Sequence, residues 1–156
     1  MKITHLTYLY SHGAFPASDE WRLCQDEMMT AIGSIIWPPD NPRKRFEIYP
    51  ESGKRRGQGN GVKPIKTLFL GSLESDGWSI KDRQNPFNFD AVKFVDDIPC
   101  VGVEWETGNV SSSHRSINRM LLSQTEGKFS AGVLIVPTKN LAYYLTDRIG
   151  NLEELE

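Results

Sequence analysis

The chain has 156 residues, which is enough for one domain with a hydrophobic core, and we expect a single domain over residues 1–156. Its formal net charge is −2, so any binding of nucleic acid has to come from local positive charge. Two cysteines without a metal-binding pattern, and no apolar run of the about 20 residues that a membrane span needs, predict a cytoplasmic protein with reduced thiols.

The first third of the chain predicts one helix followed by a long irregular segment. Residues 1–11 alternate imperfectly between apolar and polar and form either an extended arm or a short strand. Residues 18–36 carry apolar side chains three and four positions apart, which predicts an amphipathic helix with Ser18 as its N-cap and Pro38 beyond its end. Residues 40–64 show no such period and predict an irregular connection.

Glycine and positive charge are concentrated in residues 53–66, the basic glycine-rich loop. Four glycines accompany five lysine or arginine residues, and no acid occurs from Ser52 to Leu73. Two interpretations stay open. The segment is a solvated surface loop, or it contacts a polyanion, whose phosphates need positive charge and whose backbone needs small residues for close approach.

The rest of the chain predicts alternating strands and helices. Strands are expected over 65–73, 89–95, 100–106 and 132–137, and helices over 111–124 and 140–156. Ser111 or Ser112 would cap the first of these helices, and Gly150 would interrupt the second. This order of elements predicts an α/β fold with a central mixed sheet flanked by helices.

The strand 100–106 carries two carboxylates on one face. Alternation sends Glu104 and Glu106 to one side and Val103 and Trp105 to the other, with the Cα atoms of the two acids about 7 Å apart.

A third acid joins them if strand 89–95 pairs antiparallel with strand 100–106 through the short link, because Asp90 then lies near Glu104 and Glu106. Three interpretations stay open for such a corner: acids that are merely solvated, an acid/base pair as in a glycosidase, or a site for a divalent cation. Oxygen ligands would favour Mg²⁺ or Mn²⁺ over zinc.

The order of Asp90, thirteen intervening residues and then Glu104-Trp105-Glu106 resembles the D-x(n)-E-x-E form of the PD-(D/E)xK nuclease core, although Phe89 replaces the motif's proline. Most of the chain is similar to the BglII-like family of type II restriction endonucleases, whose E-x-E variant is known from BamHI- and BglII-type enzymes. The similar segments are "MKITHLTYLYSHGA", "GNGVKPIKTLFLGSLESDGW", "FDAVKFVDDIPCVGVEWETGNVSSSHRSINRM" and "GVLIVP…YYLTDRIGN".

The resemblance implies a restriction-endonuclease-like three-layer fold and an Mg²⁺-dependent endonuclease that cuts duplex DNA, with Mn²⁺ able to substitute. Asp90 and Glu104 match the metal-ligating acids of the motif. Glu106 matches the lysine position, where it would accept a proton from the attacking water or ligate a second metal. The resemblance further implies a homodimer, a cognate DNA methyltransferase and a prokaryotic or phage-encoded system. The alternative is a relative that binds DNA or a partner without cleaving.

Further candidates come from the flanking elements. The fold commonly has an acid on its first helix near the site, and Glu27 or Glu20 could serve. His114 could also act as a general acid. Candidate DNA contacts lie in the basic glycine-rich loop and on helix 111–124, and they are Lys54, Arg55, Arg56, Asn60, Lys63, Ser112, His114, Arg115, Asn118 and Arg119.

Overall fold

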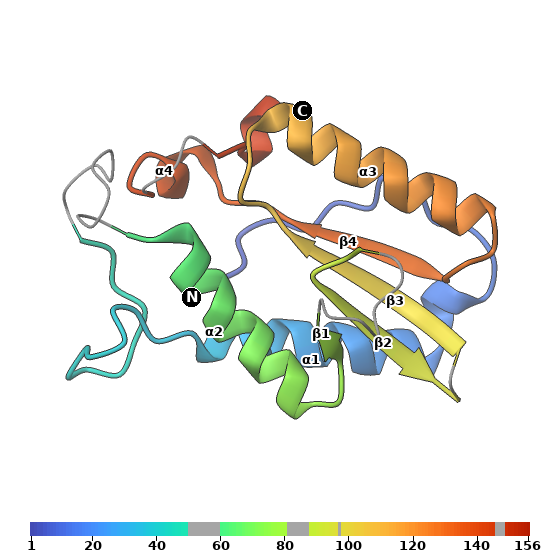
Figure 1. The fold of residues 1–156 in the computed structure, drawn as a ribbon, viewed down its shortest axis with the longest axis horizontal. Coiled ribbons are helices and arrows are strands. Elements are labelled where there is room, and N and C mark those ends of the chain that lie inside the picture. The colour runs from blue at the N-terminus through green and yellow to red at the C-terminus, as the bar shows by residue number, and fades with distance from the viewer. Residues whose placement is uncertain (50–59, 81–87, 97, 146–148) are drawn as a thin grey trace.

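The fold is a four-stranded mixed sheet between helices (Figure 1). A computed structural model of the chain describes residues 1–49, 60–80, 88–96, 98–145 and 149–156. The arrangement confirms the predicted α/β class with helices on both faces of a mixed sheet. Within these ranges, no helix combines the length and the apolar character needed to cross a membrane.

The sheet has the order β1-β2-β3-β4. Its strands are β1 (Ser79–Ile80), β2 (Ala91–Val95), β3 (Ile98–Trp105) and β4 (Ala131–Ile135). The first two pairings are antiparallel, and β4 runs parallel to β3 with Val133 opposite Val103. Three of the predicted strands are therefore confirmed, and the pairing of β2 with β3 is the predicted one.

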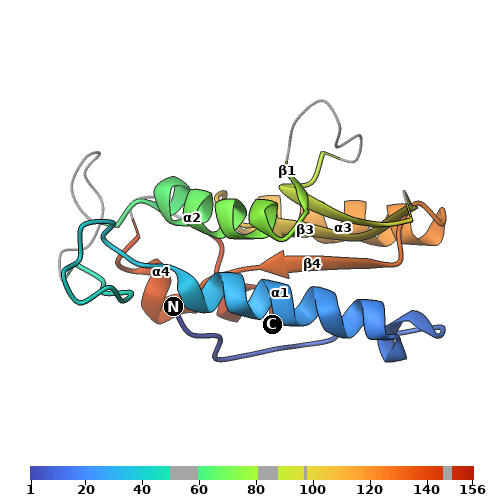
Figure 2. The same ribbon diagram turned by 90° about the horizontal axis from the view of Figure 1, so that it is seen from below.

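Helices α1 (Asp19–Ser34) and α2 (Val62–Ser75) cover one face of the sheet (Figures 1 and 2). Ser18 caps α1 as predicted, because its hydroxyl accepts a hydrogen bond from the Trp21 amide at 3.1 Å. The larger hydrophobic core lies between these helices and the side chains of β3 that point toward them, Val101, Val103 and Trp105.

The prediction of a strand over 65–73 is wrong, because these residues belong to α2. The buried side chains of α2 are Val62, Ile65, Phe69 and Leu73, which are spaced three or four residues apart and therefore share one helical face. Three consecutive apolar residues at 68–70 made this helical spacing hard to recognise in the sequence. The basic glycine-rich loop consequently ends where α2 begins, and residues 50–59 lie outside the described residues.

Helix α3 (Val110–Thr125) covers the opposite face of the sheet. Its N-cap is Asn109, whose side chain accepts a hydrogen bond from the Ser112 amide at 3.2 Å, so neither serine that was predicted as the cap fills that position. Met120 packs over β4, where a Cβ atom on Gly132 would come within 2.8 Å of the Met120 Cγ atom. A glycine at position 132 thus lets α3 lie close to the sheet.

The C-terminal segment differs from its prediction. The helix expected over 140–156 is wrong: α4 spans only Lys139–Ala142, and a single 3₁₀ turn follows at Leu152–Glu154. The Gly150 amide instead donates to the Gly108 carbonyl at 2.8 Å, which holds this segment against the start of α3. The Gly150 amide is therefore bonded to a residue far away in the sequence and not to a carbonyl within a helix.

The N-terminal segment is an extended arm rather than a strand. It runs along the outer side of α1 and joins that helix through a 3₁₀ turn at Phe15–Ala17 (Figure 2). The Gln25 side chain of α1 donates a hydrogen bond to the Tyr8 hydroxyl at 3.0 Å. Of the two alternatives left open by the sequence, the structure selects the arm.

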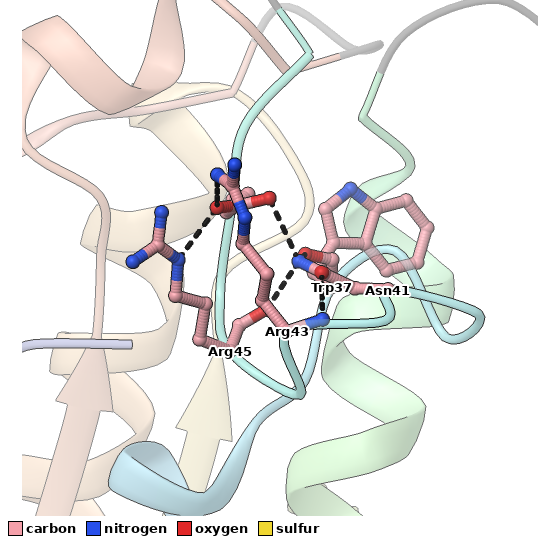
Figure 3. Close-up of polar contacts among 5 residues, drawn as sticks. Trp37, Asn41, Arg43 and Arg45 are labelled. Carbon is pink, nitrogen blue, oxygen red and sulfur yellow. Dashed lines mark hydrogen bonds and ion pairs between the residues drawn. The ribbon is translucent and has the colours of Figure 1, made fainter.

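The buried amide of Asn41 organises the segment that follows α1 (Figure 3). Its nitrogen donates to the Arg45 carbonyl at 2.9 Å and to the Glu47 carboxylate at 3.0 Å, and its oxygen accepts from the Arg43 amide at 2.9 Å. The guanidinium groups of Arg45 and Arg43 both bind Glu47, and these bonds lower the pKa of that carboxyl group. The described part of the predicted irregular connection is therefore held by its own polar contacts.

Asn60 holds this segment to the C-terminal region through the hydrogen bonds of its buried amide. It is 0% exposed, and its oxygen accepts from the Trp37 indole at 3.0 Å and from the Tyr49 amide at 2.9 Å. Its nitrogen donates to the carbonyls of Tyr49 and Tyr144 at 3.2 and 2.9 Å. Because its amide is fully used inside the protein, Asn60 supports the fold and does not offer the DNA contact that the sequence suggested.

Replacing Asn60 by alanine tests this structural role. Asn60→Ala leaves several buried backbone and indole groups without partners, so we expect it to lower the free energy of unfolding by about 2–4 kcal/mol. Urea denaturation followed by circular dichroism measures the loss. Asn118→Ala, on the exposed surface of α3, is the matched control and should change stability by less than about 0.5 kcal/mol. Equal stability of the two variants would contradict the assignment.

Candidate active site

Asp90 lies directly before β2, at the end of an inner strand of the sheet. Its amide donates to the Val103 carbonyl at 2.9 Å, so the ladder between β2 and β3 extends back to this residue. Its side chain is almost fully buried, at 3% exposure for the residue. One carboxylate oxygen accepts from the Trp105 amide at 2.8 Å, and the other accepts from the Lys66 ammonium at 2.5 Å. Backbone and helix α2 together fix its position.

Glu104 points from β3 toward α3, on the face opposite the core residues Val103 and Trp105. This is the face that strand alternation predicted. Its side chain is 13% exposed and forms an ion pair with Arg119 of α3. The Arg119 guanidinium also lies over the Phe89 ring, 5.0 Å from its centroid. Each of the two acids is thus paired with a cation from a different helix.

The surroundings of Glu104 favour its neutral form. The pKa of Glu104 is raised to about 7, and burial of its carboxyl group is the largest cause. The negative charge of the nearby Asp90 carboxylate and a hydrogen bond between the two acids raise this pKa further. The positive charges of Arg119 and Lys66 act in the opposite direction and do not cancel the rise. Further positive charge placed beside this carboxyl group would stabilise its ionised form.

Glu106 follows β3 and is directed toward the first turn of α3. It is 6% exposed, and its two oxygens accept from the Gly108 amide at 2.5 Å and from the Ser113 hydroxyl at 2.6 Å. Gly108 permits this approach, since a Cβ atom there would lie 2.6 Å from the Ser112 hydroxyl oxygen and 3.1 Å from Glu106. Glu106 therefore has a fixed position at the wall of the site.

The three acids do not meet as a single cluster. In the part of the chain that the structure describes, no group of three or more histidine, cysteine or acidic side chains is arranged to hold a metal ion. Asp90 and Glu104 lie together, whereas the hydrogen bonds of Glu106 direct its carboxylate to α3. Glu106 stands apart from the other two acids only through the hydrogen bonds of its carboxylate, because its amide still extends the ladder between β3 and β4 by donating to the Ile135 carbonyl at 2.9 Å.

All three acids nevertheless line one pocket of about 350 Å³, between α2 and the start of α3. Its walls carry both signs of charge and several hydroxyl groups. They are formed by Lys66, Asp90, Glu104, Trp105, Glu106, Thr107, Gly108, Ser112, Arg115, Ser116 and Arg119. A pocket with buried carboxylates and peripheral cations suits a ligand that combines a divalent cation with a phosphate group.

Helix α3 presents three of the predicted DNA contacts to this pocket. Ser112, Arg115 and Arg119 lie three and four residues apart and therefore share one side of the helix. The Arg115 guanidinium donates to the Ser112 hydroxyl at 2.9 Å. His114 and Asn118 are exposed on α3 and are not among the pocket residues, which makes a general-acid role for His114 unsupported by its position.

The remaining candidates lie elsewhere. Lys63 is exposed in the first turn of α2, and Lys54, Arg55 and Arg56 lie outside the described residues.

Glu27, a proposed auxiliary acid, does not line the pocket. Its carboxylate accepts from the Trp78 indole at 2.7 Å and pairs with Lys93 at 2.9 Å, between α1 and β2. Glu20 is exposed on the first turn of α1.

Two residues of the site escaped the sequence analysis. Lys66 was assigned to a strand and counted only as a loop charge, and its contact with Asp90 spans 24 residues of sequence. Ser113 was counted only within the predicted helix 111–124, and its contact with Glu106 depends on the path of the chain between β3 and α3. For Ser113 the helical period of α3 could have helped, because it separates the buried Ser113 from its exposed neighbours.

Comparison with known proteins gives consistent results. A family model described as "Restriction endonuclease BamHI" matches residues 1–156. The type II restriction enzyme OkrAI of Oceanobacter kriegii is 39% identical over 162 residues, covering 100% of this chain and 78% of OkrAI. The type II restriction enzyme BamHI of Bacillus amyloliquefaciens is 38% identical over 146 residues, covering 84% of this chain and 64% of BamHI. The chain thus spans only part of the length of each relative.

The raised pKa of Glu104 predicts how stability depends on pH. A carboxyl group whose pKa is higher in the folded protein binds protons more tightly when folded, so its contribution to stability is lost as pH rises from about 4.5 to about 7. Glu104→Gln cannot ionise and should remove this loss. In EDTA, we therefore expect the stability of the wild type relative to Glu104→Gln to fall between pH 5 and pH 7.5 in urea denaturation.

Glu74→Gln, at an exposed position near the end of α2, serves as the control for this measurement. Its stability should follow that of the wild type at every pH. Parallel curves for the wild type and Glu104→Gln would show that Glu104 titrates as it does in the unfolded chain.

Proposed function

The chain belongs to the BamHI family of restriction endonucleases, and on this basis we propose that it is a metal-dependent endonuclease that hydrolyses phosphodiester bonds of duplex DNA. The observation that carries the proposal is the placement of Asp90 and Glu104 together in a pocket that cations of α2 and α3 line. The E-x-E sequence of Glu104 to Glu106 supports, as a finer proposal, kinship with BglII-like enzymes within this group.

The two acids fit a hard divalent cation. They offer carboxylate oxygens, which Mg²⁺ prefers and Mn²⁺ accepts, and the raised pKa of Glu104 reflects a site that favours added positive charge. We propose that Asp90 and Glu104 hold Mg²⁺, with Mn²⁺ able to substitute. When bound, such a cation lowers the pKa of a coordinated water and offsets charge on phosphate oxygens.

Glu106 is the proposed proton acceptor. Hydrogen bonds from Gly108 and Ser113 hold its carboxylate at the pocket wall, so its position does not depend on the substrate. In hydrolysis, the water oxygen bonds to phosphorus while the bond from phosphorus to the 3′ oxygen breaks and leaves its electron pair on that oxygen. The water proton passes to Glu106, and solvent supplies the proton that the 3′ oxygen takes up.

The start of α3 is the proposed contact for the DNA backbone. Ser112, Arg115 and Arg119 face the pocket, and the helix N-terminus adds a favourable dipole for a phosphate. Lys63 and the basic residues at 54–56 would add contacts to neighbouring phosphates, and His114 and Asn118 would contact DNA beside the pocket. We further propose a homodimer, which would cut both strands symmetrically, and a cognate methyltransferase that protects host DNA.

Amide replacements of the two acids test the proposed metal ligands. Asp90→Asn and Glu104→Gln keep the side-chain shape and a hydrogen-bonding oxygen, but they lose the negative charge. We expect each to reduce Mg²⁺-dependent cleavage of duplex DNA by about 10²-fold or more while the circular dichroism spectrum stays that of the wild type. The control is Glu74→Gln, which should cleave normally. Full cleavage by either amide variant would exclude that residue as a ligand.

Glu106→Gln separates proton transfer from binding. The glutamine can still accept from Gly108 and can donate to the Ser113 hydroxyl, so the start of α3 should keep its structure. We expect single-turnover cleavage to fall by about 10²-fold and DNA binding in Ca²⁺ to change by less than about threefold. Equal losses in cleavage and binding would assign Glu106 a structural role.

A further inference from the structure

Lys66 is the contribution of α2 to the pocket. The other described residues of the pocket wall are Asp90 and residues of the segment 104–119, so Lys66 reaches the site from a separate layer of the fold. Its side chain is only 20% exposed, and its ammonium lies 2.5 Å from an oxygen of the Asp90 carboxylate. A lysine held this far from solvent is uncommon unless it is paired, and here the partner is a proposed metal ligand.

The other cations of the pocket have different positions. Arg119 is paired with Glu104 and packed over the Phe89 ring. Arg115, also of the pocket wall, is exposed and donates a hydrogen bond to the Ser112 hydroxyl. Lys66 is therefore the cation placed against Asp90.

The residue at position 106 supports the proposal that the positive charge for the phosphate comes from another element of the fold. Glu106 stands there, and an acid cannot offset the negative charge that builds up on a phosphate during hydrolysis. An ammonium group on a flexible four-carbon stem can do so, and it can shift from a carboxylate to a neighbouring phosphate oxygen without movement of the backbone.

We propose that Lys66 is a further catalytic residue, whose ammonium pairs with Asp90 in the free protein and binds a non-bridging oxygen of the scissile phosphate in the DNA complex. The proposal rests on the proposed endonuclease function. Lys66 makes no covalent bond and transfers no proton. It offsets charge on the non-bridging oxygens while the bond from water to phosphorus forms and the bond to the 3′ oxygen breaks. The competing explanation is a purely structural ion pair, in which Lys66 only offsets the charge of the buried Asp90 carboxylate.

Rescue with small amines distinguishes the two explanations. Lys66→Ala opens space for a small ammonium ion, and we expect it to lower the single-turnover rate of duplex cleavage in Mg²⁺ by about 10²-fold. Ethylammonium should restore at least about tenfold of this loss in a saturable manner, because it can donate a hydrogen bond to the phosphate. Tetramethylammonium at the same ionic strength cannot donate one and should restore nothing.

Two further variants complete the experiment. Lys66→Gln can still hydrogen-bond to Asp90 without carrying charge, and it should show the same loss of rate, which keeps the test valid if Lys66→Ala folds poorly. Lys128→Ala removes a lysine whose side chain is 54% exposed and which does not line the pocket, and it is the control, with cleavage expected within about twofold of the wild type.

The outcomes separate this proposal from the proposed function. Cleavage by Lys66→Gln at the wild-type rate, or a Lys66→Ala rate that ethylammonium does not raise, would overturn the role of Lys66 and leave the endonuclease assignment standing. A wild-type protein that shows no Mg²⁺-dependent cleavage would overturn both.

Discussion

The pairing of two buried carboxylates with cations from two different helices is the constraint around which this site is built. Asp90 and Glu104 lie side by side where the inner strands β2 and β3 begin and end, and burying their charges without compensation would be costly. Lys66 of α2 binds the first and Arg119 of α3 binds the second. Because these helices cover opposite faces of the sheet, the site fixes how both layers are placed, and a shift of either helix would leave a buried charge without a partner.

The connection from β3 to α3 positions Glu106, the third acid of the pocket. It leaves the sheet after Glu106, whose carboxylate accepts hydrogen bonds from the Gly108 amide and from the Ser113 hydroxyl of α3. Gly150, from the C-terminal segment, approaches so closely that a Cβ atom would lie 2.8 Å from the Ser113 hydroxyl oxygen. A segment remote in sequence therefore helps to hold an acid of the pocket, which links the fold of the C-terminal region to the proposed chemistry.

The part of the site that depends on local pattern was predictable from the sequence. Strand alternation and a short link are enough to bring Asp90 beside Glu104, and the structure has this pairing. The rest depends on contacts between distant segments. The apolar run of α2 resembles a strand in the sequence, and packing of one side of this segment against the sheet shows that it is a helix. Only in this helix does Lys66 lie within reach of Asp90. Asn60 was predicted to contact DNA because its four internal hydrogen bonds are made with Trp37, Tyr49 and Tyr144, which lie 11 to 84 residues away in the sequence.

The proposed cation site between Asp90 and Glu104 can be examined with manganese in place of magnesium. Diffraction from crystals grown with Mn²⁺, recorded where manganese scatters anomalously, tests it most directly because the signal marks the metal itself. We expect an anomalous peak within bonding distance, about 2.0–2.3 Å, of a carboxylate oxygen of each acid. Absence of a peak there, or a peak bound by other side chains, would contradict it.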